Sequence, residues 1–459
     1  MNHMVLFHKT PARWNKQSWL AQHQHEDRLG DCLGEQPATS GVETLVNEDL
    51  YIQLCLKLKE HCGIDHIHIV QGYETSEAKN WFVEEKEGKY TVSESITYWS
   101  IGGLNHLHDL PPVSLVFSRG NYPHLHSFLR KHISALKSAY WMHYPATSAW
   151  FPHLDAFIDH VQGQSTSSVP SRVRQNLEGM WVEHNMGAFN QKDDHWFLEN
   201  FGVLVERLKS KRHQPIPGPY DAVLVDDEAL MDFHQSKHPE AEIVSFHKPC
   251  LGSEQLLRHH RKHDLMFCGT TLQATKNHKQ FLDLLYSIDQ VITSTLDVAI
   301  VGNEGSLPAF SEGLRRDFLH VRVTDYGEVS RQRLADLFND TRNVVVTSGR
   351  DSNPRIIQEA GVCGARVLVV DTLSDGLTVL KANPILGAVL MTDKSSWYYQ
   401  KNGNLIFDVN SKLVNQLLKQ MNHSRHPRLT ARVAKGLYTF DNVVGGLAER
   451  FNLQAKARD

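Results

Sequence analysis

The sequence lacks any uninterrupted run of about 18 to 20 apolar residues, the length that a membrane-spanning helix needs. Its opening, MNHMVLFHKTPARWNK, also lacks the long apolar segment and the small-residue cleavage site of a secretory signal peptide. We therefore expect a cytoplasmic protein, either free or peripherally bound at a membrane surface.

Cysteine is scarce, and the six cysteines include no Cys-x-x-Cys pair. Scattered thiols within apolar segments are typical of buried free cysteines rather than of disulfides or zinc ligands. Histidine is abundant, with 28 residues, but no cluster has the Glu of a His-Glu-x-x-His helix or a cysteine partner at zinc-finger spacing. The sequence therefore predicts no metal site and no bound cofactor.

An excess of positive charge is also missing, because 48 Lys and Arg face 52 Asp and Glu and give a formal net charge of -4. A general affinity for nucleic-acid phosphates is therefore disfavoured, although basic residues at 209–212 and 258–262 leave a local basic groove open. No Gly-x-Gly-x-x-Gly motif opens a helix after a strand, which argues against a nicotinamide oxidoreductase.

A chain of 459 residues is longer than one hydrophobic core usually supports, and 41% hydrophobic residues suffice to fill two cores. We expect an N-terminal domain over residues 1–252, a C-terminal domain over 253–425 and a final helical segment over 426–459. The boundary is placed well after the Pro-rich stretch RHQPIPGPY, because the AVLV segment that follows this stretch is expected to belong to the N-terminal sheet.

Strands alternate with helices in the N-terminal half. The pattern LVNEDLYIQLCLKLKEH predicts a helix over 45–61, and short apolar runs predict strands over 66–70, 113–117, 139–142 and 222–225. The first 44 residues have an apolar start, Met4 to Phe7, followed by polar sequence of weak periodicity, so no element is assigned there. The alternation favours an α/β fold with a parallel sheet covered on both faces.

The C-terminal half has a more regular pattern of five strands joined by short helices, which indicates a parallel Rossmann-like sheet. The predicted strands are 265–269, 296–302, HVRVTDYG at 320–327, 343–348 and 365–371. The predicted helices are 279–292, 311–318, 330–338 and 354–363, with a final helix over 437–451.

A candidate anion site follows the strand that ends at Ser348. A polar turn leads from this strand to Pro354, which is expected at the first position of a helix. Helix N-termini bind anions, and carboxylates such as Asp351 and Glu359 accept hydrogen bonds from sugar hydroxyls. The turn therefore fits a sugar nucleotide, although a capped strand-turn-helix without any ligand has the same pattern.

The segment SGRDSNPRIIQEAGVCGARVLVV resembles the Glu-x7-Glu signature of retaining GT-B glycosyltransferases (glycosyl transferases group 1), with Asp351 and Glu359 at the two glutamate positions. The segments LMFCGTTLQATKNHKQFL, LDVAIVG, YGEVSRQRLADLF and LYTFDNVVGGLAERF resemble further parts of this family in the same order. The resemblance implies two Rossmann-like domains facing a cleft, with a C-terminal helix that crosses back to the N-terminal domain.

The resemblance also implies roles for individual residues. Asp351 is expected to contact the donor sugar, Glu359 the nucleotide ribose, and Lys276 the diphosphate. The arginine that the family has after its glycine is replaced here by Thr270, so another arginine is expected to supply that charge. The further residues assigned to donor binding are Gly269, Thr270, Arg350, Ser352, Asn353 and Arg355.

Two residues of the N-terminal half are candidates for the same site. His143 in SAYWMHYPATSAWF follows an apolar strand, where the family often has a histidine that meets the donor sugar, so it joins Asp351 as a catalytic candidate. Arg119 in SLVFSRGNYPHLHSFLRKH is expected in a loop, where it would meet an anionic acceptor or the diphosphate. Both residues also fit purely structural roles.

The activity implied by the resemblance is that of a hexosyltransferase-like glycosyltransferase that retains configuration and needs no metal. The donor is a nucleotide-diphosphate sugar, with a UDP-sugar favoured, and the acceptor is a carbohydrate, lipid-linked or other hydroxyl. One alternative is a glycosyltransferase that modifies a nucleic-acid base. Another, suggested by Thr270 and Asp351, is a nucleotide-sugar-binding protein without turnover.

Overall fold

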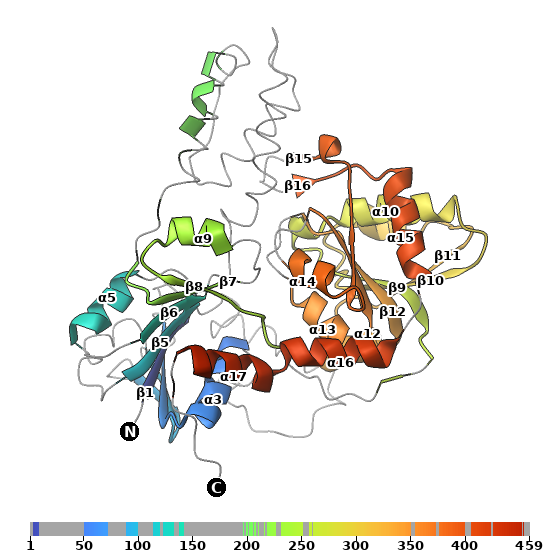
Figure 1. The fold of residues 1–459 in the computed structure, drawn as a ribbon. Helices are drawn as coiled ribbons and strands as arrows, with labels where there is room; N and C mark the ends of the chain where they lie inside the picture. The colour runs from blue at the N-terminus through green and yellow to red at the C-terminus, as the bar shows by residue number, and fades with distance from the viewer. Residues whose placement is uncertain are drawn as a thin grey trace.

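The computed structural model describes residues 3–8, 50–71, 89–99, 113–119, 123–132, 137–141, 196, 199–200, 202–204, 206–207, 210, 215, 218–225, 231–250, 257–258, 260–349, 354–372, 376–399, 405–423, 426–451 and 453. Within these ranges the chain forms two large, mainly parallel β-sheets with helices packed against them (Figure 1). No helix in these ranges is both long and apolar enough to cross a membrane.

The N-terminal sheet has eight strands in the order β3-β4-β2-β1-β5-β6-β7-β8. Neighbouring strands are parallel, except that β3 and β4 are antiparallel. The strands are β1 (His3–His8), β2 (His66–Gln71), β3 (Lys89–Ser93), β4 (Ile96–Trp99), β5 (Val113–Arg119), β6 (Lys137–Trp141), β7 (Ala222–Val225) and β8 (Glu242–Ser245). The AVLV segment is β7, and it belongs to this sheet as expected.

Strand β1 lies at the centre of this sheet, between β2 and β5. Its residues Met4 to Phe7 are fully buried, although the sequence left this segment unassigned. Four consecutive buried side chains are typical of a central parallel strand that is covered on both faces. The alternation that identifies a half-buried strand is absent in such a segment, so only its neighbours in space identify it.

Helices pack on both faces of the N-terminal sheet. Helix α3 (Leu50–Cys62) and helix α17 (Phe440–Arg450) share one hydrophobic cluster with Met4 and Leu6 of β1. On the opposite face, α5 (Pro123–His132) brings His126 against Phe7 of β1. The short helix α9 (Met231–Lys237) lies between β7 and β8 in the sequence.

The C-terminal sheet has six strands, all parallel, in the order β11-β10-β9-β12-β13-β14. The strands are β9 (His263–Cys268), β10 (Leu296–Val301), β11 (Val321–Asp325), β12 (Thr341–Val346), β13 (Arg366–Val370) and β14 (Gly387–Leu390). The first five are the strands predicted from the sequence, and β14 is an addition at the edge.

Both faces of the C-terminal sheet are covered, so its side chains divide between two hydrophobic clusters: Leu265 and Phe267 of β9 face one cluster, and Met266 faces the other. The helices of the first cluster are α10 (His278–Asp289), α11 (Pro308–Leu314) and α15 (Ser411–Met421). Those of the second are α12 (Arg331–Asn339), α13 (Ile356–Val362), α14 (Leu377–Ala382) and α16 (Pro427–Tyr438). Short elements complete the domain: 3-10 turns Ala274–Lys276 and Lys394–Ser396, and the hairpin β15 (Tyr398–Tyr399) and β16 (Leu405–Ile406).

Several helix boundaries differ from those predicted, among them the end of α10, which lies at Asp289 rather than at 292. Helix α11 ends at Leu314, so it lies earlier than 311–318. Helix α13 begins at Ile356, because Pro354 and Arg355 form a turn before it, and Pro354 is therefore not the first helical residue. The final helix is two helices that are broken at Thr439, whose extended backbone (φ -71°, ψ 148°) ends α16 and precedes α17.

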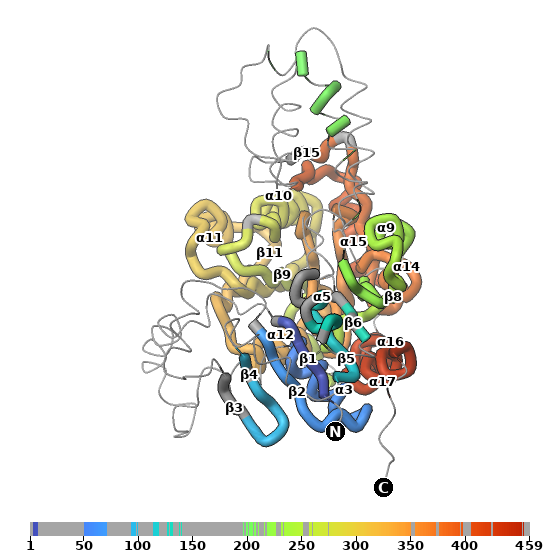
Figure 2. The backbone as a smooth tube through the Cα atoms, turned by 90° about the vertical axis from the view of Figure 1, so that its left-hand side faces the viewer, coloured from blue at the N-terminus to red at the C-terminus, as the bar shows by residue number. Residues whose placement is uncertain are grey.

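Helices α16 and α17 connect the two sheets. Gly361 of α13 has no side chain, and a Cβ placed there would lie 3.1 Å from Cβ of Ala434 in α16, so the two helices pack closely. Helix α17 then continues to the N-terminal sheet beside α3, as both views show (Figures 1 and 2). The segment 246–250 after β8 meets α16 where the amide of Cys250 donates to the carbonyl of Tyr438 at 2.7 Å.

His126 is a fully buried histidine in the N-terminal domain. Its ring meets the edges of Phe7 and Tyr220 at centroid distances of 5.2 and 4.8 Å. Neither ring nitrogen has a hydrogen-bond partner within the part of the chain that the structure describes. Burial lowers the pKa of His126 to about 3, and the charge of Arg130 contributes to the shift.

The burial of His126 predicts acid destabilisation. In the unfolded chain the histidine has a pKa of about 6.5, so below that pH the unfolded state binds a proton that the folded state excludes. Between pH 7 and pH 5 this lowers the free energy of unfolding by about 2 kcal/mol. Urea unfolding of His126→Leu at both pH values should show a correspondingly smaller difference than the wild type. The same change at exposed His260 should leave the difference unaltered, and equal differences in all three proteins would contradict the assignment.

Glycines in α17 predict an easy gain in stability. A Cβ at Gly445 would meet none of the described residues within 4 Å, and glycine inside a helix costs about 0.8 to 1 kcal/mol relative to alanine. Gly445→Ala should therefore raise the free energy of unfolding by up to about 1 kcal/mol. Gly387→Ala is the opposite control, since its Cβ would lie 1.8 Å from the carbonyl oxygen of Val367. Chemical denaturation in which both substitutions act in the same direction would refute this reading of the packing.

Candidate functional site

Several of the predicted site residues lie outside the described residues. These are His143, Arg350, Asp351, Ser352 and Asn353. Arg119 is the last residue of β5, paired in register with Trp141, rather than a residue of the following loop. The structure therefore describes the side chains of Thr270, Lys276, Arg355 and Glu359, together with the backbone of Gly269.

Two glycines, one after β9 and one after β10, let the ends of these strands lie close together. The amide of Gly269 donates to the carbonyl of Val301 at 3.0 Å, and a Cβ at Gly269 would lie 3.1 Å from the side chain of Lys276. Gly302, after β10, has a φ of +90°, and a Cβ there would lie 2.7 Å from the carbonyl oxygen of Gly269. The ends of β9 and β10 can approach each other this closely only because both positions lack a side chain.

Thr270 occupies the position where the resemblance leads us to expect an arginine. Its hydroxyl donates a hydrogen bond to the carboxylate of Glu304, in the turn after β10. The backbone amide of Glu304 is in turn held by the hydroxyl of Thr271 at 3.1 Å. This position therefore carries a neutral hydroxyl bonded to a carboxylate, and any cation for a bound anion must come from another residue.

Lys276, in the turn after β9, and Glu359, in helix α13, both influence the same thiol. Burial raises the pKa of Cys268, at the end of β9, to about 12. The negative charge of Glu359 adds to this rise, whereas the positive charge of Lys276 opposes it. Lys276 and Glu359, which the resemblance assigns to one site, thus both exert their charge on the same thiol at the carboxyl end of β9.

Glu359 lies in the first turn of α13 and is half-buried, at the end of the helix where the dipole favours a negative charge. It lines a small cavity of about 20 Å³ between α12 and α13, together with Cys250, Arg331 and Phe338. Burial and the charge of Glu359 raise the pKa of Cys250, whereas Arg331 and Arg355 oppose the rise. Arg331 thus lines the same cavity as the carboxylate, and Arg355 precedes Glu359 by one helical turn.

Arg331 was not recognised as a site residue from the sequence. It is the first residue of α12, directly after Ser330, whose hydroxyl accepts a hydrogen bond from the amide of Arg333. The capping serine was the signal that fixed this helix start, but nothing in the pattern indicated that the start of α12 faces α13. Arg355, which was predicted, is an exposed residue at the N-cap position of α13.

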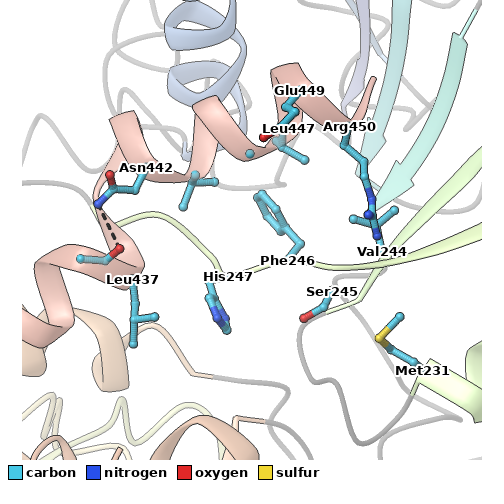
Figure 3. Close-up of a pocket in the computed structure, with 13 residues that line it drawn as sticks. Met231, Val244, Ser245, Phe246, His247, Leu437, Asn442, Leu447, Glu449 and Arg450 are labelled. Atoms are coloured by element: carbon cyan, nitrogen blue, oxygen red, sulfur yellow. Dashed lines mark hydrogen bonds between the residues drawn. The ribbon is translucent and has the colours of Figure 1, made fainter. Parts of the chain in front are cut away.

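A larger pocket of about 830 Å³ lies along the edge strand β8, between α9 and the junction of α16 and α17 (Figure 3). Its polar lining includes Ser245, His247 and Asn442, and Asn442 donates to the carbonyl of Gly436 at 3.0 Å. None of the residues predicted for the site lines it. The chain segments that join the two sheets form part of its wall.

The described cysteines are all free, and four of the five, Cys55, Cys62, Cys250 and Cys363, are buried. Among the residues that the structure describes, no group of three or more His, Cys, Asp or Glu side chains is arranged to hold a metal ion. The acidic segment after β7 lies outside the described residues from position 226 to 230.

No protein-family model matches the sequence, and no curated protein matches it. Solved structures do resemble the fold. A sucrose-phosphate synthase from Thermosynechococcus elongatus superimposes with a TM-score of 0.53 at 11% identity, covering 98% of each chain. HepE from Anabaena, in complex with UDP, has a TM-score of 0.50 at 11% identity, covering 98% of this chain and 100% of its own.

A glycosyltransferase from Rickettsia africae also matches, with a TM-score of 0.50 at 10% identity, covering 98% of both chains. At such low identities the likeness concerns the fold. The resemblance read from the sequence is confirmed at this level: the chain has the GT-B fold, with two Rossmann-like domains and a C-terminal helix that crosses back to the N-terminal domain.

Proposed function

We propose that the protein is a glycosyltransferase that moves a sugar from a UDP-sugar to an acceptor hydroxyl. The observation that carries this proposal is the joining of the turn that carries Lys276 to the chain after β12, which leads to Glu359, at the carboxyl end of β9, where both charges act on Cys268. In open parallel sheets, ligands bind outside the carboxyl ends of the strands. A cation and a carboxylate are the groups that a nucleoside diphosphate needs at that place, for its phosphates and for its ribose hydroxyls respectively.

The proposed chemistry is electrostatic. Departure of UDP leaves negative charge on the diphosphate, and Lys276, with Arg331 and Arg355 close to Glu359, would stabilise that charge in fixed positions. Asp351 would hold the sugar and His143 would approach it from the N-terminal domain, as the resemblance implies. We further propose retention of configuration and no requirement for a metal ion, because positively charged side chains take over the role of a divalent cation.

One observation favours a second candidate function, a nucleotide-sugar-binding protein without turnover. Thr270 is bonded to the Glu304 carboxylate where an arginine is expected, so this position contributes no positive charge. The site would then rely on Lys276 and the arginines near Glu359 to stabilise the leaving group. Weaker stabilisation of UDP in the transition state lowers turnover more than it lowers binding.

The alternative of a nucleic-acid acceptor has less support. Two arginines of its basic segment at 258–262 are engaged within the C-terminal domain. Arg258 binds both carboxylate oxygens of Asp340 at 2.7 Å, and Arg261 is buried and donates to the carbonyl of Cys363 at 2.9 Å. Side chains held in this way are not available for backbone phosphates.

The proposal predicts both UDP binding and UDP release. A saturating excess of UDP should raise the melting temperature, since a ligand at about 100 times its Kd stabilises the native state by about 2.7 kcal/mol. Incubation with a panel of UDP-sugars should release UDP from at least one of them, in the presence of EDTA as well as in its absence. Binding without release identifies the non-catalytic candidate, and the absence of any nucleotide-dependent shift refutes both.

A second prediction concerns Glu359. Hydrogen bonds to charged groups contribute about 1.5 to 3 kcal/mol, so Glu359→Gln should raise the Kd for UDP by about tenfold or more. The loss should be much smaller for 2′,3′-dideoxy-UDP, which lacks the ribose hydroxyls. Glu312→Gln, at an exposed position of α11, is the matched control. Calorimetric titrations in which Glu359→Gln binds both nucleotides as the wild type does would remove Glu359 from the site.

A further inference from the structure

The backbone of Asn277 is unusual. Its φ is 55°, and it is the one non-glycine residue with a positive φ among the described residues. Only glycine and, with less ease, asparagine or aspartate adopt this left-handed conformation routinely. Asn277 follows Lys276 directly and stands immediately before α10, so this conformation sets the direction in which the chain enters the helix.

The side chain of Asn277 does not cap the helix that it precedes. An asparagine at this position normally accepts a hydrogen bond from an amide of the first turn, but α10 has no side-chain cap. Instead, Nδ2 donates to the carbonyl of Thr347 at 2.9 Å and to the carbonyl of Leu405 at 3.0 Å. The residue is only 2% exposed, so both bonds are shielded from water.

Further contacts join the same two turns. The hydroxyl of Thr347 donates to the carbonyl of Lys276 at 2.9 Å, and the amide of Gly349 donates to the carbonyl of Thr275 at 3.1 Å. A Cβ at Gly349 would lie 1.8 Å from the carbonyl oxygen of Leu405 and 2.8 Å from Nδ2 of Asn277. The turn after β9 and the turn after β12 are therefore locked together, with the carboxamide of Asn277 at the centre.

These are the two turns that lead to the proposed donor residues. Lys276 lies on the first, and Gly349 on the second directly precedes, in the sequence, residues 350–353 and then Pro354 and Glu359 of α13. We propose, on the basis of the function proposed above, that Asn277 is a positioning residue that fixes Lys276 relative to the turn after β12, so that the pair receives the diphosphate of a nucleotide.

The physical reason lies in the nature of lysine. An ammonium group on a four-carbon stem is a mobile point charge, and its interaction with a phosphate depends on where its backbone is held. A buried carboxamide that bridges two loops fixes that backbone before the ligand arrives. The conformational entropy of the site is then lost during folding rather than on binding. Preorganised sites bind more tightly for this reason.

The test compares UDP with uridine, because uridine lacks the phosphates that Lys276 would bind. Asn277→Gly keeps a left-handed backbone within reach and removes the carboxamide. We expect it to raise the Kd for UDP about tenfold, a change of about 1.4 kcal/mol, and the Kd for uridine less than about twofold. The nucleoside should be spared because α13 is held independently by its packing on α16.

Lys276→Ala should show the same selective loss of UDP affinity. The double variant should lose little more than either single variant, because a mispositioned lysine and a missing one have the same effect. Asn410→Gly is the matched control. It removes an asparagine before α15 whose side chain is a true cap, accepting from the amide of Leu413 at 3.0 Å, and should leave both affinities unchanged.

Equal losses for UDP and uridine, or additive losses in the double variant, would overturn the proposal, because they indicate general damage to the domain. Thr347→Val, which removes the bond to Lys276, serves in the same comparison if Asn277→Gly does not fold. Hydrogen exchange without any ligand tests the clamp separately. The Gly349 amide should exchange faster in Asn277→Gly, and unchanged exchange would overturn the clamp. A wild-type protein that does not bind UDP refutes the proposed function and, with it, the donor role of Asn277.

Discussion

The parallel pairing of β9 with both β10 and β12 is the constraint on which the candidate site depends. Because the three strands run in one direction, the turns that follow them meet at one edge of the sheet. The turn after β9 brings Lys276, the turn after β10 brings Glu304, and the chain after β12 leads to Glu359. Strand pairing thus brings turns that are far apart in the sequence to one edge, and the side chains of Thr270, Asn277 and Thr347 then join them.

The close contact between α13 and α16 links this edge to the rest of the molecule. Gly361 lets Ala434 approach, and Gly364, with a φ of +76°, leaves room for the carbonyl of Pro427 at the start of α16. Helix α17 then adds its apolar side to the cluster of the N-terminal sheet. Helix α13, which carries Glu359, thus packs directly on α16, and α16 leads into α17 on the N-terminal domain.

The fold could largely be predicted because its strands are short apolar runs bounded by polar turns, and because the C-terminal segments matched a known order. The prediction missed β1, because its four buried residues show no alternation. It also missed the break at Thr439, where one extended residue interrupts the predicted final helix. Glu359 and Lys276 could be proposed from the resemblance to a known family. Other features depend on which turns meet in space, and no local sequence pattern contains that information. They are the Thr270–Glu304 bond, the position of Arg331 beside α13 and the hydrogen bonds of Asn277 to two other segments.

The bond from the Cys250 amide to the Tyr438 carbonyl has a mechanical consequence for the whole molecule. It ties the segment that follows β8 to the end of α16, beside the extended residue Thr439, so the connections between the domains are fastened to each other at one place. A displacement of either connection is therefore transmitted to the other at Tyr438, whose ring is fully buried.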